Sequence, residues 1–172
     1  MQIEATQISQ DEMYYLKYLE KTDDNQEIQN LKNTIQYAYN QIQDGKTINF
    51  SLVNKMHKII LSSVRGLDKT PGQIRTTQNW IGSRSVGIDG AIFIPPALED
   101  IYELLLNLCE YMNDEFIAPL LINIALSHAQ FETIYAYNDG NGRLGYALIP
   151  VQLDLLDKEK PILYYLNRPP VK

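Results

Sequence analysis

Residues 117–134 constrain the fold of this sequence more than any other segment, because nearly every position in them is apolar or small. A helix that is apolar on most of its sides is typical of a protein interior rather than of a surface. We therefore predict that this segment forms the central helix of the domain. Its apolar and small residues include Leu120, Leu121, Ile122, Ile124, Ala125, Leu126, Ala129 and Phe131.

Other segments carry apolar residues at spacings of three and four, which is the period of an amphipathic helix. A helix is predicted over residues 27–44, with Gly45 at the position of a C-cap, and a second begins near Asn49. A third spans residues 98–112 and carries acidic residues on its other face, and a last one begins at Leu144. The chain has no repeat or interdomain linker, so residues 1–172 are expected to form a single domain.

The stretch between residues 71 and 96 does not show the helical period. The dipeptide Asp89-Gly90 lies there between two runs of alternating apolar residues. Asp-Gly in this context is a strong signal for a hairpin turn, because both turn positions favour residues that tolerate positive φ. The alternating residues are Val86 and Ile88 before the turn and Ile92 and Ile94 after it. The predicted fold class is therefore an all-α bundle that carries one small β-hairpin.

The composition excludes several classes of protein. The 15 basic residues against 21 acidic ones give a net charge of -6, which argues against nucleic acid as a partner. No apolar run approaches the roughly 18 residues of a membrane span, and the N-terminus does not resemble a signal peptide. The single cysteine, Cys109, cannot form an internal disulfide and lies among leucines of a predicted helix. We therefore expect a soluble cytoplasmic protein, with no membrane partner and with Cys109 in its core.

A loop at residues 139–143, with the sequence Asp-Gly-Asn-Gly-Arg, separates the predicted central helix from the last one. Its glycines let the backbone approach a ligand closely, and the N-terminus of a helix offers free N–H groups and a positive dipole end to an anion such as phosphate. Arg143 adds a full charge and is the only basic residue between Arg84 and Lys158. Asp139 is a hard oxygen ligand placed to hold Mg²⁺ against the same phosphates. The alternative is a tight turn that only joins two helices.

The loop lies within a longer motif. Residues 131–146 read Phe-Glu-Thr-Ile-Tyr-Ala-Tyr-Asn-Asp-Gly-Asn-Gly-Arg-Leu-Gly-Tyr and resemble the core motif of the Fic (Fido-domain) family, His-Pro-Phe-x-Asp-Gly-Asn-Gly-Arg-x-x-Arg. Residues 71–82 resemble the family segment that leads into a hairpin flap, residues 93–96 the end of that flap, and residues 163–166 a C-terminal Leu-Tyr-Leu-Ser element. The resemblance covers essentially the whole chain, and it implies a Fic/Fido helical bundle with a β-hairpin flap at about residues 81–94.

Domains of the Fic family transfer part of a nucleotide, most often AMP from ATP, onto a Ser, Thr or Tyr hydroxyl of a target protein. The resemblance implies that Asp139 is the Mg²⁺ ligand and that Arg143 contacts a phosphate directly. Gly140, Asn141 and Gly142 would form the anion hole around the α- and β-phosphates. The implied cofactors are therefore ATP or ADP together with Mg²⁺.

The resemblance also implies a partner. The flap would hold a segment of an unidentified target protein beside the nucleotide by strand addition, which is an ordinary way to bind an extended peptide. The flap positions that would contact the target are Ile88, Gly90, Ile92 and Phe93.

Two positions depart from the family motif at the chemistry itself. Tyr135 occupies the position of the catalytic His, whose general-base role is worth about 10²–10⁴ in rate. A phenol with a pKa of about 10 is only roughly one part in a thousand phenolate at neutral pH. Tyr146 occupies the position of the second Arg, and its neutral hydroxyl lacks the charge that would hold the γ-phosphate. This pattern predicts a domain that binds a nucleotide but has weak, altered or absent transfer activity.

The N-terminus resembles the end of the family's inhibitory motif, Ser-x-x-x-Glu-Gly/Asn, with Glu4 as the glutamate. This implies the remnant of an inhibitory segment at about residues 1–12. In the family that glutamate pairs with the second Arg, and Tyr146 cannot form this ion pair. The two histidines, His57 and His128, are interpreted as hydrogen-bonded packing residues.

Two functions stay open at this point. The first is a Fic-type protein adenylyltransferase, or a degenerate relative that still binds Mg-nucleotide, with a minor variant in which Tyr135 itself accepts AMP. The alternative is a non-enzymatic protein-interaction module that uses the flap to bind a partner strand. The sequence leaves the oligomeric state open.

Overall fold

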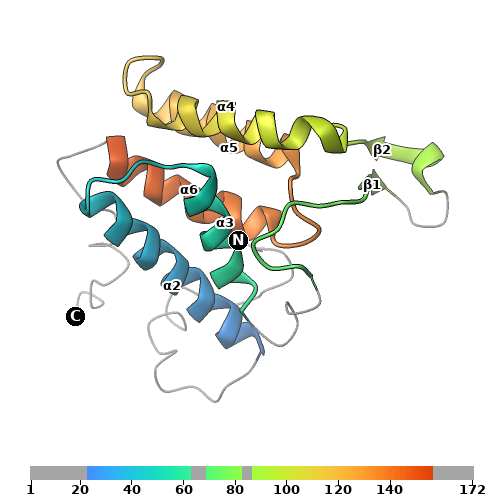
Figure 1. The fold of residues 1–172 in the computed structure, drawn as a ribbon, viewed down its shortest axis with the longest axis horizontal. Helices are drawn as coiled ribbons and strands as arrows, with labels where there is room; N and C mark the ends of the chain where they lie inside the picture. The colour runs from blue at the N-terminus through green and yellow to red at the C-terminus, as the bar shows by residue number, and fades with distance from the viewer. Residues whose placement is uncertain (1–22, 63–68, 83–86, 157–172) are drawn as a thin grey trace, which may run out of the picture.

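The computed structural model describes residues 23–62, 69–82 and 87–156. Three predictions lie outside these residues: the inhibitory segment with Glu4, the C-terminal element at 163–166, and the flap residues 83–86, which include Val86. Along the described chain the secondary structure consists of α2 (Asp23–Gln43), α3 (Phe50–Ile60), β1 (Ile81–Gly82), the 3-10 turn η2 (Ile88–Gly90), β2 (Ala91–Phe93), the 3-10 turn η3 (Leu98–Asp100), α4 (Ile101–Asn113), α5 (Leu120–Ile134) and α6 (Asn141–Leu156). Figure 1 shows a helical bundle from which the hairpin projects at one end. The predicted fold class is confirmed.

Local signals in the sequence set the ends of the first helices. Gly45 follows α2 with a φ of 80°, a left-handed conformation that glycine adopts without a steric penalty. Its N–H donates to the Ile42 carbonyl at 2.9 Å, and the next N–H, that of Lys46, donates to the Gln41 carbonyl at 3.1 Å. Asn49 caps α3, because its side-chain oxygen accepts the Leu52 N–H at 3.0 Å.

The central helix of the bundle is α6, and the prediction that residues 117–134 form the central helix is wrong. Helix α6 packs against α2, α3, α4 and α5, whereas the main contacts of α5 are with α4 and α6. Several apolar residues of α5 are exposed, and Leu121 is 71% exposed. The buried face of α5 carries Ile124, Phe131 and Ile134, and also the polar Asn123 and Ser127, which accept hydrogen bonds from the buried Gln152 amide of α6 at 2.7 and 3.0 Å.

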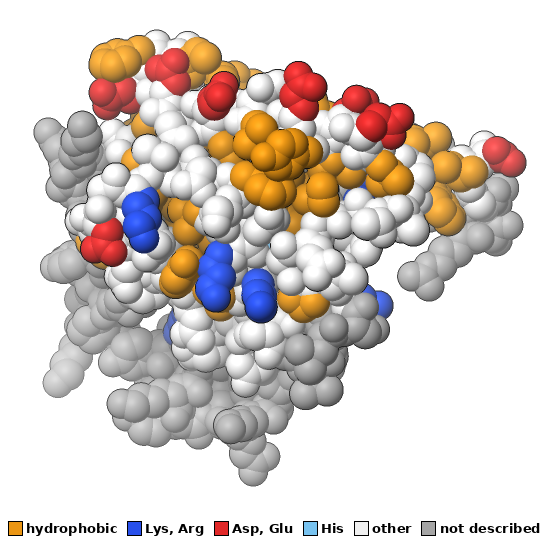
Figure 2. Space-filling model, viewed as in Figure 1, with side chains coloured by type: hydrophobic (Ala, Val, Ile, Leu, Met, Phe, Trp, Pro, Cys, Tyr) orange, Lys and Arg blue, Asp and Glu red, His pale blue; other side chains and the backbone are white. Residues whose placement is uncertain are grey.

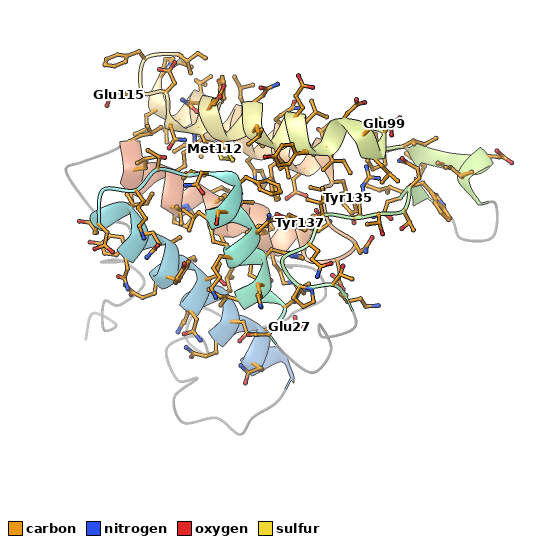
Figure 3. All side chains as sticks on the ribbon, in the orientation of Figure 1. Glu27, Glu99, Met112, Glu115, Tyr135 and Tyr137 are labelled. Atoms are coloured by element: carbon orange, nitrogen blue, oxygen red, sulfur yellow. The ribbon has the colours of Figure 1, made fainter. Side chains whose placement is uncertain are left out.

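Helix α4 has the two faces that its sequence predicts. Its apolar face is buried in the core and includes Cys109, where burial raises the pKa of the thiol to about 11. Its exposed edge carries acidic side chains, which Figure 2 shows as a row along one edge of the molecule. Glu99 and Glu115, labelled in Figure 3, lie beyond its two ends. None of the helices in the described part of the chain is long and apolar enough to cross a membrane.

The hairpin is present, but its turn differs from the prediction. Strands β1 and β2 are antiparallel, with Ile81 opposite Phe93 and Gly82 opposite Ala91. Asp89 and Gly90 lie between the strands as predicted, but they belong, with Ile88, to a 3-10 turn directly before β2 rather than to a two-residue hairpin turn. The positive φ occurs at Gly87 instead, at 66°. Within this turn the Gly90 N–H donates to the Gly87 carbonyl at 3.3 Å.

Candidate functional site

The candidate site is the connection between α5 and α6, and it begins with a strained residue. Tyr135 ends α5 in the left-handed conformation, with φ 47° and ψ 55°, and its N–H donates to the Phe131 carbonyl at 3.3 Å. A bulky residue adopts positive φ at an energetic cost, and such strain is found preferentially at functional sites. The conformation turns the chain sharply out of the helix. Figure 3 shows Tyr135 and Tyr137 on this connection.

Asn141 closes the loop from the inside. Its side-chain oxygen accepts the Tyr137 N–H at 3.0 Å, and its amide group donates to the Tyr137 carbonyl at 2.8 Å. The residue is 1% exposed. The sequence assigned Asn141 to the anion hole; in the structure its side chain is occupied in holding the loop.

Both the backbone conformation at position 140 and the packing around it favour glycine. It has a φ of 75°, and a Cβ at this position would lie 3.3 Å from the Cδ2 of Leu61 and 3.5 Å from the Nε2 of His57. Its carbonyl accepts the Leu144 N–H at 3.0 Å, at the start of α6. The loop backbone at Gly140 is therefore closely packed against His57 and Leu61, and a side chain there would need these neighbours to shift slightly.

His57 of α3 holds the loop through a hydrogen bond to its backbone. Its Nδ1 accepts the Gly72 N–H at 2.8 Å, so Nε2 carries the hydrogen and donates to the Asp139 carbonyl at 2.9 Å. Burial lowers the pKa of His57, although the bond to Asp139 and the charge of Asp139 raise it. The imidazole is therefore held neutral between two backbone groups, which confirms its interpretation as a hydrogen-bonded packing residue.

Tyr137 is a second support. Its ring stacks on His57, with centroids 3.8 Å apart and an interplanar angle of 21°, and its hydroxyl donates to the Asn54 side-chain oxygen at 2.6 Å. The residue is fully buried, and burial raises the pKa of the hydroxyl. Tyrosine is therefore accommodated at the position where the family motif has Phe, because its hydroxyl has a partner.

Arg75 connects the loop to the flap, a role that no pattern in the sequence predicted. It is 2% exposed, and its guanidinium donates to the carbonyls of Tyr135 at 3.0 Å, Thr77 at 3.2 Å and Pro96 at 2.5 Å. Its own N–H donates to the Ala136 carbonyl at 2.8 Å. One side chain therefore connects the end of α5 with both ends of the flap.

The charged side chains of the loop contact one another. Arg143 of α6 places Nη2 at 3.2 Å from Asp139 Oδ1 and Nη1 at 3.6 Å from Oε2 of Glu27, a residue of α2. Asp139 Oδ1 also accepts the Gly140 N–H. The structure thus brings together the predicted Asp139, Gly140 and Arg143, and adds Glu27, which lies more than 100 positions away in the sequence and which sequence reasoning missed.

The remaining predicted residues lie around this loop. Tyr146 follows Arg143 by one turn of α6, is exposed, and has its ring centroid 5.5 Å from that of His128. The flap is apolar and exposed: Ile92 is 87% exposed, and Ile88 is exposed as well, while Phe93 is half-buried. Gly90 is exposed in the 3-10 turn.

These features define a class of protein before any comparison. The fold is a helical bundle in which a braced, glycine-containing loop leads into the N-terminus of the central helix, beside an exposed apolar hairpin. Residues 47–153, more than half of the chain, match the model of the Fic/DOC family. The chain therefore belongs to the Fic family.

Individual relatives agree with this assignment. The chain is 28% identical over 97 residues to the protein adenylyltransferase fic-1 of Caenorhabditis briggsae, which covers 55% of this chain and 17% of that protein. A Fic domain containing signaling protein from Bacteroides thetaiotaomicron has the same fold, with a TM-score of 0.73, 18% identity, and coverage of 90% of this chain and 59% of that one. Fic-1 (residues 134–508) from C. elegans matches with a TM-score of 0.66, 17% identity, and coverage of 89% and 45%. The chain thus spans less than two thirds of each relative.

Proposed function

We propose that this domain binds a magnesium–nucleotide at residues 139–143. The observation that carries the proposal is the braced loop: Gly140 has a positive φ and is closely packed against α3, and the chain runs from it into the first turn of α6, where Arg143 lies. Helix N-termini with close backbone and a cation bind phosphate groups. In this proposal the backbone of Gly140, Asn141 and Gly142 faces the α- and β-phosphates, and Arg143 contacts a phosphate.

The donor set suits Mg²⁺ held together with a nucleotide rather than a metal bound by protein alone. Among the described residues, no group of three or more His, Cys, Asp or Glu side chains is placed to hold a metal ion. Mg²⁺ is commonly bound through one or two carboxylates plus substrate phosphates and water. Asp139 supplies such a carboxylate at the start of the loop, so the site fits the ion, which would neutralise phosphate charge.

The same proposal assigns weak, altered or absent adenylyl transfer to this domain. In the transfer, a target hydroxyl oxygen forms a bond to the α-phosphorus, the bond to the leaving pyrophosphate breaks, and the hydroxyl proton goes to a base. Tyr135 occupies the position of that base and Tyr146 the position of the outer cation. Tyr135 is a poor substitute for a His base, because a phenol is a much weaker base than an imidazole at neutral pH. Tyr146 is a poor substitute for the Arg, because its hydroxyl carries no positive charge.

The flap is the proposed docking site for a target protein. A protein adenylyltransferase is among the relatives, and strand addition to a short exposed sheet is a common way to hold an extended peptide. The exposed Ile92 on β2 supports the alternative as well, in which the flap binds a partner and the loop has no ligand. A cytoplasmic location, a single-domain architecture and an inhibitory role of Glu4 stay predictions.

Calorimetry with Mg-ATP and Mg-ADP tests the nucleotide site. We expect binding by the parent protein and its loss in Arg143→Ala, whereas Lys55→Ala, which removes an exposed cation of α3, should bind like the parent. Failure of the parent to bind either nucleotide, or binding that ignores Arg143→Ala, would favour the interaction module.

Transfer activity is tested with labelled ATP. We expect little label transfer by the parent and by Tyr135→His alone, and a gain in the double variant Tyr135→His/Tyr146→Arg. Strong transfer by the parent would contradict the proposed loss of chemistry.

A further inference from the structure

A carboxylate from an early part of the chain contacts the arginine of the loop. Glu27 lies near the beginning of α2, where Figure 3 labels it, and its Oε2 is 3.6 Å from Nη1 of Arg143. The Glu27 side chain is 15% exposed and that of Arg143 is 12% exposed, so solvent screens this pair less than a surface ion pair. Arg143 is thus held at two nitrogens, by Glu27 and by Asp139.

The position of Glu27 depends on the core and not on the loop. Helix α2 packs against α3 and α6. One turn after Glu27, the buried Asn30 donates its amide hydrogen to the Ile60 carbonyl of α3 at 3.3 Å. The Asn30–Ile60 bond therefore anchors the start of α2 to α3 and involves none of residues 139–143.

The two carboxylates that contact Arg143 differ in their other contacts and proposed roles. Asp139 Oδ1 already accepts the Gly140 N–H as well as Arg143, and Asp139 is the residue proposed to face Mg²⁺. When an Asp139 oxygen turns toward Mg²⁺, its charge no longer balances that of the Arg143 guanidinium. The guanidinium and the metal ion then repel each other, because both are positively charged. Glu27 lies outside the loop and keeps its contact during such a change.

We propose that Glu27 is a positioning residue for nucleotide binding, which holds the Arg143 guanidinium at the first turn of α6 while Asp139 serves the metal. The inference rests on the proposed function and adds to it a residue outside the motif. It involves Arg143, whereas the inhibitory role implied for Glu4 concerns the position of Tyr146.

An opposing effect of Glu27 also has a physical basis, and it would change the nucleotide affinity in the opposite direction. A carboxylate beside a phosphate site repels the ligand, so a Glu27 that only competed with phosphate would weaken nucleotide binding. Removing it would then tighten binding. A positioning role predicts that removing it weakens binding, and that the loss depends on Arg143.

The experiment is a double-mutant cycle on the dissociation constant of Mg-ADP, measured by calorimetry. Glu27→Gln keeps the shape of the side chain and removes its charge, and Arg143→Lys keeps the charge but offers one nitrogen in place of the two that are now held. We expect Glu27→Gln to weaken binding by about tenfold in the parent, the order of effect expected when a partly buried ion pair loses one charge, and by less than about twofold in the Arg143→Lys background.

Two further variants serve as controls. Glu110→Gln removes the same charge from an exposed position on α4 and is expected to bind like the parent. Glu27→Asp keeps the charge on a shorter side chain and is expected to weaken binding less than Glu27→Gln. Thermal unfolding of each variant reports whether it is folded during the titration.

Tighter or unchanged binding by Glu27→Gln would overturn the inference, and so would an equal loss in both backgrounds, because that result indicates a general structural effect. Absence of Mg-ADP binding by the parent itself would overturn the proposed function and this inference with it. The two failures are therefore distinguishable, since the parent titration tests the proposed function and the double-mutant cycle tests the positioning role of Glu27.

Discussion

Replacing His57 with phenylalanine keeps a flat ring against Tyr137 but removes both hydrogen bonds from the imidazole to the backbone. The Gly72 N–H and the Asp139 carbonyl, both part-buried, then lose their partners, and each unsatisfied group costs about 1–3 kcal/mol. We therefore expect the free energy of unfolding to fall by about 2–6 kcal/mol, measured by urea denaturation followed by circular dichroism. His128→Phe is the matched control, because Nδ1 of His128 has no hydrogen-bond partner in the described part of the chain.

The same residue predicts how stability depends on pH. Burial lowers the pKa of His57 in the folded protein below its ordinary value of 6.5. As the pH falls below about 6.5, the unfolded chain binds a proton that the folded chain does not, so the free energy of unfolding decreases until the folded pKa is reached. A single proton limits this slope to about 1.4 kcal/mol per pH unit, and above about pH 7.5 the slope from His57 is absent.

The assay compares the parent with His57→Phe between about pH 8 and pH 5, the range that contains the ordinary titration of histidine. Other titrating groups contribute alike to both proteins and cancel in the difference between their unfolding free energies. The destabilisation caused by the substitution should therefore be largest at pH 8 and shrink as the pH falls. A difference that stays constant over the whole range would refute the assignment of His57 as a neutral group between two backbone partners.

Three other substitutions test the braces of the loop by denaturation. Gly140→Ala should lower the free energy of unfolding by about 1–3 kcal/mol, and by more than Gly45→Ala, which has a similar φ but open space at its Cβ. Arg75→Met removes three hydrogen bonds to carbonyls and should cost about 3 kcal/mol or more. Tyr137→Phe should cost about 1–2 kcal/mol through its buried hydroxyl, whereas Tyr102→Phe, at an exposed ring, should change stability by less than about 0.5 kcal/mol. Equal effects of either matched pair would contradict the roles assigned to Gly140 and Tyr137.

Features that depend on a few neighbouring residues could be predicted from the sequence. The C-cap at Gly45, the start of a helix near Asn49 and the two-faced helix α4 follow from local hydrogen bonding and from helical periodicity, and the structure confirms all three. The two-residue turn predicted at Asp89-Gly90 is instead a 3-10 turn, because a dipeptide signal does not exclude a 3-10 turn at the same residues.

Features that depend on packing between distant segments could not be predicted from the sequence. The apolar run of α5 predicted burial on most sides, but Leu121 is exposed, whereas the polar Asn123 and Ser127 are buried, where they accept hydrogen bonds from Gln152 of α6. In the site, Asp139, Gly140 and Arg143 were found from their spacing. Their supports, Glu27, His57 and Arg75, lie far away in the sequence, and no local pattern connects them to the loop.

The nature of these supports bears on whether adenylyl transfer, which we propose is weak, altered or absent, can be restored. Arg75 contacts the carbonyls of Tyr135 and of other residues, and His57 contacts the carbonyl of Asp139, so both hold the backbone of the loop rather than its motif side chains. A new side chain at position 135 or 146 leaves these bonds in place. Tyr135→His/Tyr146→Arg should therefore fold with the parent's loop geometry, and its unfolding temperature is the check: a large drop would show that the two tyrosines are part of the scaffold and not only substitutes for catalytic groups.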